Sequence, residues 1–215
     1  MLEIGDSIGN DLGWGLAREL RHTKNLRLIQ IDTSSTGLSA SWFFNWPHHL
    51  KVDLARFHPN LVIVCLGAND EQALAVNHVS HAFGSAQWAA VYRHRVRQMM
   101  QLVAGAKSYL LWVGLPIMQP DHYNSGVNLL NSIYSRSAQS VAGAVFQPTT
   151  HLLADAHGKY RAGARVNGVE SALRAPDGIH FTVVGENVLA TFVVHQISTI
   201  FHVTLAARAP MRIDG

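Results

Sequence analysis

The stretch Ile4-Gly5-Asp6-Ser7-Ile8-Gly9-Asn10 decides how the rest of this sequence is interpreted. It predicts the end of a short strand, a tight glycine turn and a serine in the first turn of a helix. The unpaired N–H groups at a helix start carry partial positive charge, so a serine placed there lies beside donors that can stabilise an oxyanion. Gly-Asp-Ser also occurs in ordinary turns and helix caps. The stretch alone therefore leaves both a catalytic and a capping role open for Ser7.

The composition is that of a globular and rather apolar domain. The chain has 215 residues, of which 48% are hydrophobic and 14% are charged, and this is enough to build the core of one α/β domain. The longest apolar runs, Leu61–Leu66 and Tyr109–Val113, have the length of strands and are far below the roughly 20 residues of a membrane-spanning helix. We expect one domain over residues 1–205, no transmembrane segment in this chain, and a flexible tail over residues 206–215.

Charge and cysteine content narrow the function classes. The net charge is only +3, and the arginines are spread along the chain apart from Arg93, Arg95 and Arg97, which suit the solvated face of a helix. A nucleic-acid surface would show a denser basic patch with interleaved aromatic residues, so we expect no nucleic-acid partner. Cys65 is the single cysteine; it lies in an apolar run and predicts a core residue, which excludes a disulfide framework.

Strand-like and helix-like segments alternate about five times. Strands are expected over residues 2–4, 26–32, 61–66, 109–113 and 144–147. Helices are expected over residues 11–20, 47–57, 85 to about 103, 124 to about 142, and about 182 to 201. This alternation predicts an α/β fold, a doubly wound and mostly parallel sheet of about five strands with helices on both faces. Residues 72–84 and 148–176 show no clear period, so we expect a surface loop and a connection there.

Polar residues gather where the predicted strands end or a helix begins. They are Ser7, the loop Ser35–Gly37, Asn69-Asp70, and the pair Asp177 and His180. Ligands of an open parallel sheet bind outside the carboxyl ends of its strands, so we expect these residues to converge. Together they supply the parts needed for acyl transfer: a nucleophile, a base, a group that orients the base, and oxyanion donors.

Each of these residues also has an ordinary structural interpretation. Asp177 can place its carboxylate on one nitrogen of the His180 imidazole while the other nitrogen faces a serine, but an aspartate there can equally cap a turn and a buried histidine can bond to backbone. Gly37 can offer a backbone N–H and Asn69 a side-chain N–H to an oxyanion. The alternatives are a turn glycine and an Asx-turn. We interpret Asp6 and Asp70 as structural braces.

Four blocks match, in order, those of the SGNH (GDSL-like) hydrolase superfamily: Gly5-Asp6-Ser7, Gly37, Gly67-Ala68-Asn69-Asp70 and Asp177-Gly178-Ile179-His180. The chain also resembles a bacterial subgroup long catalogued as a domain of unknown function (DUF459-like). The stretches that carry this second likeness are Ser35–Leu38, Phe43–Pro47, Gly67–Gln72, Trp112–Pro116 and Asp177–Thr182. The resemblance covers nearly the whole chain.

The resemblance implies a flavodoxin-like SGNH hydrolase fold and ester hydrolysis or acyl transfer without a metal or cofactor. Ser7 would be the nucleophile, His180 the general base and then the acid, and Asp177 its partner. The Ser7 amide, Gly37 and Asn69 would form the oxyanion hole. The resemblance also implies a location in the periplasm or cell envelope, and a leader would then precede the short first strand. A cytoplasmic location is left open.

Two further features bear on the substrate. The histidine pairs His48-His49 and His78 with His81 have no Cys or carboxylate cluster at ligand spacing, so we expect no metal site. The aromatic residues of Trp42–Trp46 can form a wall for a sugar ring or an acyl chain, or they can pack in the core. Residues 72–84 and 148–176 can shape the substrate entrance.

The sequence thus predicts a serine esterase for small O-acyl groups, with the preference for acetyl esters on a carbohydrate or exopolysaccharide taken from the family. One alternative is a polysaccharide O-acetyltransferase that uses the same triad and hands the acyl group to a sugar hydroxyl. Another is a non-catalytic carbohydrate-binding or assembly protein that keeps the fold. The sequence does not indicate the oligomeric state.

Overall fold

Five parallel strands form the central sheet, in the order β2-β1-β3-β6-β7. They are β1 (Leu2–Gly5), β2 (Ile29–Asp32), β3 (Leu61–Cys65), β6 (Tyr109–Val113) and β7 (Ala144–Gln147). The computed structural model describes residues 1–119, 121–206, 208 and 211–214. The order of these five parallel strands confirms the predicted five-stranded, doubly wound parallel sheet. The chain leaves β1 toward β2 and then returns to β3 on the other side, so the strand order reverses at β1, where ligand sites of such sheets form.

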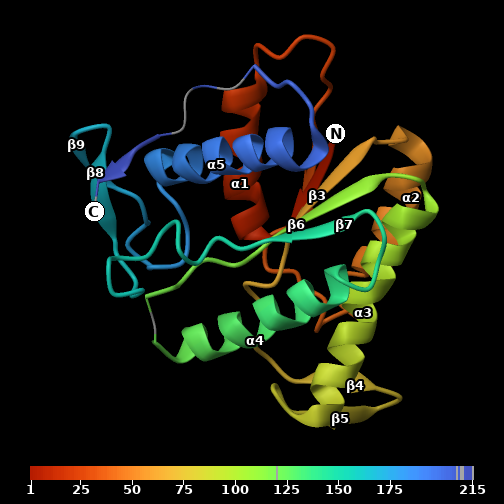
Figure 1. Cartoon of the computed structure of the whole chain (residues 1–215). Coiled ribbons are helices and arrows are strands. Elements are labelled where there is room, and N and C mark those ends of the chain that lie inside the picture. The colour runs from red at the N-terminus through yellow and green to blue at the C-terminus, as the bar shows by residue number, and fades with distance from the viewer. Residues whose placement is uncertain (120, 207, 209–210, 215) are drawn as a thin grey trace.

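Helices cover both faces of the sheet (Figure 1). On one face lie α1 (Ser7–Leu20) and α5 (Val183–Phe201), which pack with the sheet around one apolar cluster. On the other face lie α2 (Trp46–Phe57), α3 (Ala86–Gly105) and α4 (Asp121–Ala138), which enclose a second cluster. Strand β3 is buried along its whole length, as expected for a strand covered on both faces. The sheet is thus held rigidly beneath the loops at its carboxyl edge.

Helix α5 is the one helix in the described part of the chain that is long and apolar enough to cross a membrane, with a mean hydropathy of 1.2. Half of that apolar window is buried inside the domain. Its buried face packs against α1 and the sheet, and Arg18 of α1 forms an ion pair with Glu186 of α5. These contacts are those of a core helix in an α/β domain.

Two hairpins lie where the sequence predicts only loops. Strands β4 (Leu74–Val76) and β5 (Val79–His81) pair within the expected loop 72–84, and β8 (Gly163–Val166) pairs with β9 (Val169–Ala172) within the expected connection 148–176. Those two expectations are wrong in part. Both hairpins close with two residues at positive φ, Asn77-His78 and Asn167-Gly168, a turn that matches the twist of paired strands. The strands are too short to show a period.

The end of the chain also contributes a strand. Strand β10 (Ile213–Asp214) pairs with β8 in antiparallel register, whereas the sequence predicts a flexible tail from residue 206. The backbone bonds between these strands hold Ile213 and Asp214 against the hairpin, so this part of the expected tail is anchored. Helix α1 begins at Ser7, which confirms the predicted serine in the first turn of a helix, although the apolar period indicated a helix only from residue 11. Helix α4 begins at Asp121, before the predicted residue 124.

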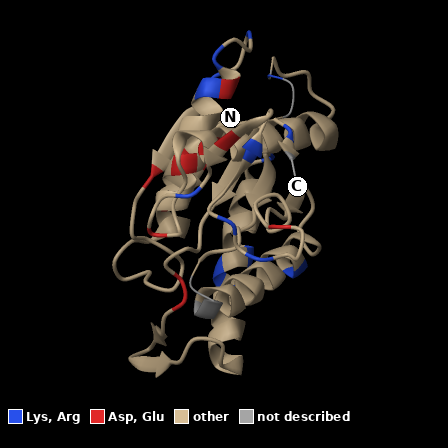
Figure 2. Ribbon diagram, turned by 90° about the vertical axis from the view of Figure 1, so that its left-hand side faces the viewer, with Lys and Arg blue, Asp and Glu red and all other residues tan. Residues whose placement is uncertain are grey.

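Charged side chains are distributed over several elements. Figure 2 shows that lysine and arginine are scattered over several helices and loops. Arg95 on α3 is half-buried and donates to the backbone carbonyls of Leu38 and Ser39 in the loop after β2. The sequence predicts Arg95 on a solvated helix face, and for this residue the prediction is wrong.

Candidate active site

Ser7 is delivered to the carboxyl edge of the sheet by a turn that only glycine can make. Strand β1 ends at Gly5, and a Cβ on that residue would lie 2.5 Å from both the Cys65 carbonyl oxygen and Gly9 Cα. Asp6 is the N-cap of α1, since its Oδ1 accepts the N–H of Ile8 at 3.0 Å. The hydroxyl of Ser7 therefore lies in the first turn of a helix whose free N–H groups face the same edge.

The second oxygen of Asp6 ties this turn to the neighbouring strand end. Asp6 Oδ2 accepts the N–H groups of Gly67 and Ala68, both at 2.9 Å. Burial raises the pKa of Asp6 to about 6, although three backbone N–H groups stabilise the carboxylate and oppose the rise. Asp6 is thus a brace between the ends of β1 and β3, as the sequence predicts, and both of its carboxylate oxygens accept backbone N–H groups.

Ser7, His180 and Asp177 form a continuous hydrogen-bonded array. The Ser7 Oγ lies 2.8 Å from His180 Nε2, and His180 Nδ1 lies 2.6 Å from Asp177 Oδ2. When Nδ1 carries the proton and donates it to Asp177, Nε2 is left as an acceptor for the serine hydroxyl. The structure therefore brings together the three residues that the sequence predicts as nucleophile, base and orienting acid.

Asp177 is held in its charged form. Its other oxygen, Oδ1, accepts the backbone N–H groups of Ile179 and His180 at 2.8 and 2.9 Å. Partial burial alone would raise the pKa of Asp177, but the hydrogen bonds from the His180 ring and from these two N–H groups outweigh burial and lower the pKa to about 2. A carboxylate that stays charged at neutral pH can stabilise an imidazolium beside it.

The two remaining expected oxyanion donors come from residues in contact with each other. Asn69 Nδ2 donates to the carbonyl oxygen of Thr36 at 3.0 Å, which belongs to the peptide that carries the Gly37 N–H. An amide nitrogen has two hydrogens, so one N–H of Asn69 remains for a ligand. A Cβ on Gly37 would lie 2.3 Å from Asp70 Oδ1, so a side chain is excluded there.

Asp70 braces the Gly37 loop from below. Its carboxylate accepts the N–H groups of Leu38 and Ser39 at 3.0 and 2.6 Å, and the hydroxyl of Tyr92 at 2.6 Å. Burial raises the pKa of Asp70, against the effect of these donors. The sequence predicts that Asp70 braces its own loop; the structure shows that it also holds the loop after β2. The sequence did not indicate that Tyr92 contacts Asp70, because the apolar spacing of its helix marks Tyr92 only as a core residue.

The loop that carries His180 is held by a buried arginine. Arg174 Nη1 donates to the Ile117 carbonyl at 2.8 Å, and Nη2 donates to the carbonyls of Ile179 and Gly178 at 2.5 and 3.3 Å. Its guanidinium also lies 4.5 Å from the centre of the Phe181 ring. Sequence reasoning missed Arg174, because its partners are backbone carbonyls, which leave no pattern in a sequence.

Two more contacts fix the His180 loop. Asp11 Oδ2 on α1 accepts the N–H of Phe181 at 2.9 Å, and Gln119 N donates to the Gly178 carbonyl at 3.0 Å. Gly178 has a φ of +71°, and a Cβ on it would lie 2.2 Å from Gln119 Cβ. The Asp11 side chain on α1, the Arg174 side chain before α5 and backbone groups of the loop after β6 thus position the base relative to Ser7.

The aromatic residues after the Gly37 loop divide into buried and exposed members. Trp46 is buried and donates from Nε1 to Thr36 Oγ1 at 3.0 Å. In contrast, Trp42 is 84% exposed and Phe43 is 56% exposed, with ring centres 6.0 Å apart. Core packing therefore explains Trp46 and does not explain Trp42 and Phe43. Within the described part of the chain, no group of three or more His, Cys, Asp or Glu side chains is arranged to hold a metal ion.

The comparisons with known proteins agree with this architecture. The family model described as "Protein of unknown function (DUF459)" matches residues 1–196. A search of curated proteins found no match.

Solved structures give a second comparison. A catalytic mutant of an acetylxylan esterase from Geobacillus stearothermophilus is 14% identical, with a TM-score of 0.66 over 97% of this chain and 95% of that one. A psychrotrophic esterase from a Pseudoalteromonas species is 11% identical, with a TM-score of 0.63 over 94% and 98%. A GDSL-like lipase from Bacteroides thetaiotaomicron is 17% identical, with a TM-score of 0.61 over 93% and 87%. At these identities the likeness shows the fold, and the predicted SGNH hydrolase fold is confirmed.

Proposed function

Because this chain belongs to the family described as protein of unknown function DUF459 and joins Ser7, His180 and Asp177 in one array, we propose that it is a serine esterase. Its substrates are small O-acyl esters, above all acetyl esters on a carbohydrate such as an exopolysaccharide. The observation that carries the proposal is the chain of two short hydrogen bonds, 2.8 and 2.6 Å long, from Ser7 Oγ through His180 to Asp177. Chemistry that needs an activated hydroxyl and a positioned base fits this arrangement.

The reaction begins with attack of Ser7 Oγ on the ester carbonyl carbon. As the Oγ–C bond forms, the serine proton passes to His180 Nε2, and the charge on the imidazolium is stabilised by Asp177. The negative oxygen of the tetrahedral intermediate is stabilised by the amides of Ser7 and Gly37 and by the free N–H of Asn69. Collapse breaks the bond to the sugar oxygen, which takes the proton from His180 and leaves as a hydroxyl.

Water then resolves the acyl-enzyme. It attacks the acyl carbon while His180 removes one of its protons, and collapse of the second tetrahedral intermediate breaks the bond to Ser7 Oγ. His180 returns the proton to the serine, and the carboxylic acid leaves. The protein ends as it began, so the cycle needs no further reactant.

The exposed aromatic pair supports a carbohydrate over a long acyl chain. Trp42 and Phe43 stand in solvent a few residues after Gly37, where a flat apolar surface can stack against the C–H face of a sugar ring. An acyl-chain pocket would instead enclose such rings, because apolar surface is stabilised by removal from water. The acetyl preference rests on the family resemblance, and one structural relative is described as an acetylxylan esterase.

A second candidate is O-acetyl transfer with the same residues. The side chains of His180 and Asp177 are partly exposed, so a sugar hydroxyl can approach the acyl-enzyme in place of water. The two activities differ in their products: hydrolysis gives free acetate, and transfer gives a newly acetylated sugar.

The experiment is to incubate the wild-type protein and Ser7→Ala with acetylated xylo-oligosaccharides and to follow acetate by proton NMR. We expect acetate release by the wild-type protein and none by Ser7→Ala. To detect transfer, an unacetylated acceptor oligosaccharide is added to the same mixture, and mass spectrometry shows whether it gains an acetyl group. No change of any acetyl signal with the wild-type protein would contradict both candidates.

A further inference from the structure

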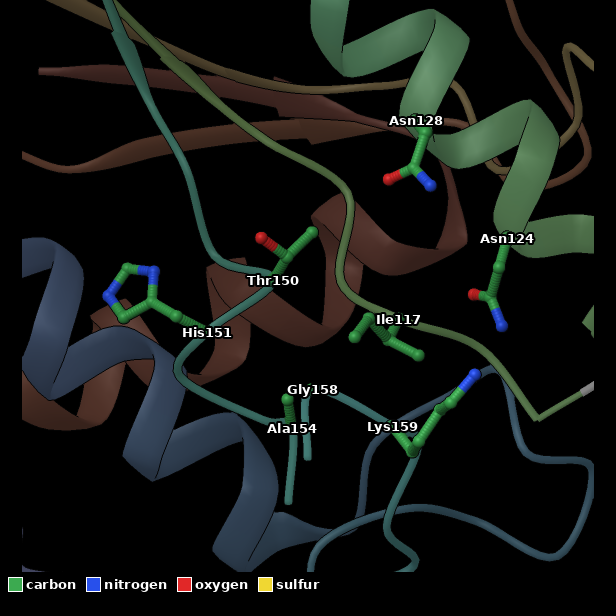
Figure 3. A pocket seen from close by; sticks show the side chains of 8 residues that line it. All are labelled: Ile117, Asn124, Asn128, Thr150, His151, Ala154, Gly158 and Lys159. Atoms are coloured by element: carbon green, nitrogen blue, oxygen red, sulfur yellow. The ribbon is translucent and has the colours of Figure 1, made fainter. Parts of the chain in front are cut away.

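A cavity of about 540 Å³ lies at the carboxyl edge of the sheet, beyond the ends of β6 and β7. Figure 3 shows that three segments surround it: the loop after β6 with Ile117, the first turns of α4 with Asn128, and the segment from Thr150 to Lys159. Its volume falls within the roughly 300–1,000 Å³ typical of small-molecule sites. The triad does not line this cavity, and the mechanism above does not use it.

The lining offers polar groups that can pair with sugar hydroxyls. Asn128 supplies an amide that both donates and accepts, and Thr150 supplies a hydroxyl that does the same. Ile117 and Ala154 add apolar surface for a ring face. A mixture of this kind, a few polar groups over a partly apolar wall, is typical of sites that orient a polar small molecule.

One neighbouring polar residue is already used within the protein. Asn124 bonds to both backbone groups of Met118, at 3.0 Å each, so its amide fixes the wall of the cavity. Asn128, one turn farther along α4, points toward the cavity in Figure 3. The wall is therefore built by Asn124, and recognition falls to Asn128 and to the segment opposite it.

The charge of the lining selects a particular kind of sugar. Lys159 brings an ammonium group to the cavity, and the lining residues in the described part of the chain include no Asp or Glu. The nearby Asp155 uses Oδ1 to accept the N–H groups of His157 and Lys159, both at 2.8 Å, so it caps the turn that presents Lys159. An anionic group in the cavity would face a positive charge and neutral donors.

The cavity wall is joined to the catalytic loop by Arg174. This buried side chain holds the carbonyl of Ile117, a lining residue, and the carbonyls of Gly178 and Ile179 beside the base. Arg174 thus links the cavity wall to the loop that carries His180. A chain of sugars that places one ring at Ser7 can extend toward this cavity along the same edge of the sheet.

We propose that this cavity is a binding site for a sugar that carries a carboxylate, a uronate residue of the acylated polysaccharide. The assignment rests on the proposed esterase function and adds the substrate class: an anionic glycan. Lys159 pairs with the carboxylate, and Asn128 and Thr150 bond to ring hydroxyls. No triad residue lines this site, so it contributes to binding and takes no part in the chemical steps.

The test measures binding in a protein that cannot turn the ligand over. Isothermal titration of Ser7→Ala with trigalacturonate and with neutral xylotriose compares an anionic and an uncharged probe of equal length. The same titrations are made with Lys159→Met added, which removes the charge and keeps the length of the side chain. Lys24→Met is the matched control, because Lys24 lies in the loop between α1 and β2, at the opposite edge of the sheet.

We expect tighter binding of trigalacturonate than of xylotriose. Lys159→Met should weaken the binding of trigalacturonate about tenfold or more, as for loss of a hydrogen bond to a charged group. Lys24→Met should leave the affinity for both probes unchanged. Equal binding of the two probes, no binding of either, or equal effects of the two lysine changes would overturn the assignment. Because no turnover is needed, failure of this test is distinct from failure of the esterase proposal, which is read from acetate release by the wild-type protein.

Discussion

Asp70 and Ser39 are joined twice across two loops: the Ser39 N–H donates to Asp70 Oδ1 at 2.6 Å, and the Ser39 hydroxyl donates to the Asp70 carbonyl at 3.0 Å. Through this pair the end of β3 fixes the shape of the loop that carries Gly37. The expected oxyanion donor Asn69 directly precedes Asp70 in the sequence. The contact between Asp70 and Ser39 therefore positions both expected oxyanion donors, the Gly37 N–H and the Asn69 side chain.

Replacement of Asp70 tests this brace. Asp70→Asn keeps the size of the side chain, but an amide NH₂ cannot accept the N–H bonds that a carboxylate accepts. We expect kcat for p-nitrophenyl acetate to fall at least about tenfold, because misplaced donors stabilise the transition state less, with a smaller change in KM. An unchanged kcat in a folded Asp70→Asn protein would show that the brace does not act on the reaction.

Asn69 is expected to act on the oxyanion directly. Asn69→Ala removes the free N–H and also the bond to Thr36, and we expect kcat to fall about a hundredfold or more. Asn60→Ala is the matched control, since Asn60 is exposed and lies just before β3, at the other edge of the sheet. If Asn69→Ala behaved like Asn60→Ala in steady-state assays, Asn69 would have no part in the oxyanion hole.

Arg174 is a positioning residue for the base. Arg174→Lys keeps the charge but replaces the planar fork, so one ammonium group cannot reach the carbonyls of Ile117 and Ile179 together in the same geometry. We expect kcat for ester hydrolysis to fall while KM changes little. We also expect a lower melting temperature. Circular dichroism and ester turnover measured on the same sample check this. Full activity with a lowered melting temperature would make Arg174 purely structural.

Two acids beneath the nucleophile turn, the buried Glu3 and the half-buried Asp32, predict a pH-dependent stability. Burial raises the pKa of Glu3 well above its usual value, and the charge of Asp32 adds to the rise; burial also raises the pKa of Asp32, to about 7. The folded protein therefore holds protons that the unfolded chain releases near the ordinary pKa of about 4. Stability is fully present below that value and falls as the pH rises toward about 7 and above.

Glu3→Gln tests the sign of this dependence. The amide is neutral at every pH, so the melting temperature of the variant should exceed that of the wild-type protein at pH 8, and the difference should shrink at pH 5. The exposed Glu170, changed in the same way, serves as control. A variant that is equally destabilised at both values would mean that the pair is not protonated in the folded state.

The sequence predicted the central sheet and the site blocks because both leave strong local signals. The buried run of β3 and the glycine turns at Gly5 and Gly67 show in the letters themselves. The β8–β9 hairpin was missed although Asn167-Gly168 is a strong turn signal, since its strands of four residues carry too few apolar positions to show alternation.

What the sequence did not indicate is how distant segments hold one another. The partners of Arg174 are backbone carbonyls, and Asp11 bonds to the backbone of Phe181, which lies 170 residues away. Such bonds depend on tertiary packing and leave no spacing rule. The exposure of Trp42 likewise follows from the folded loop, and the sequence alone left its packing open.

The role of Ser7 as nucleophile is tested by measuring hydrolysis of p-nitrophenyl esters of increasing acyl length by the wild-type protein and Ser7→Ala in parallel. We expect the wild-type protein to cleave the acetate fastest and Ser7→Ala to lose about three orders of magnitude or more in kcat. Equal rates for the two proteins would mean that Ser7 is not the nucleophile and would contradict the proposed esterase mechanism.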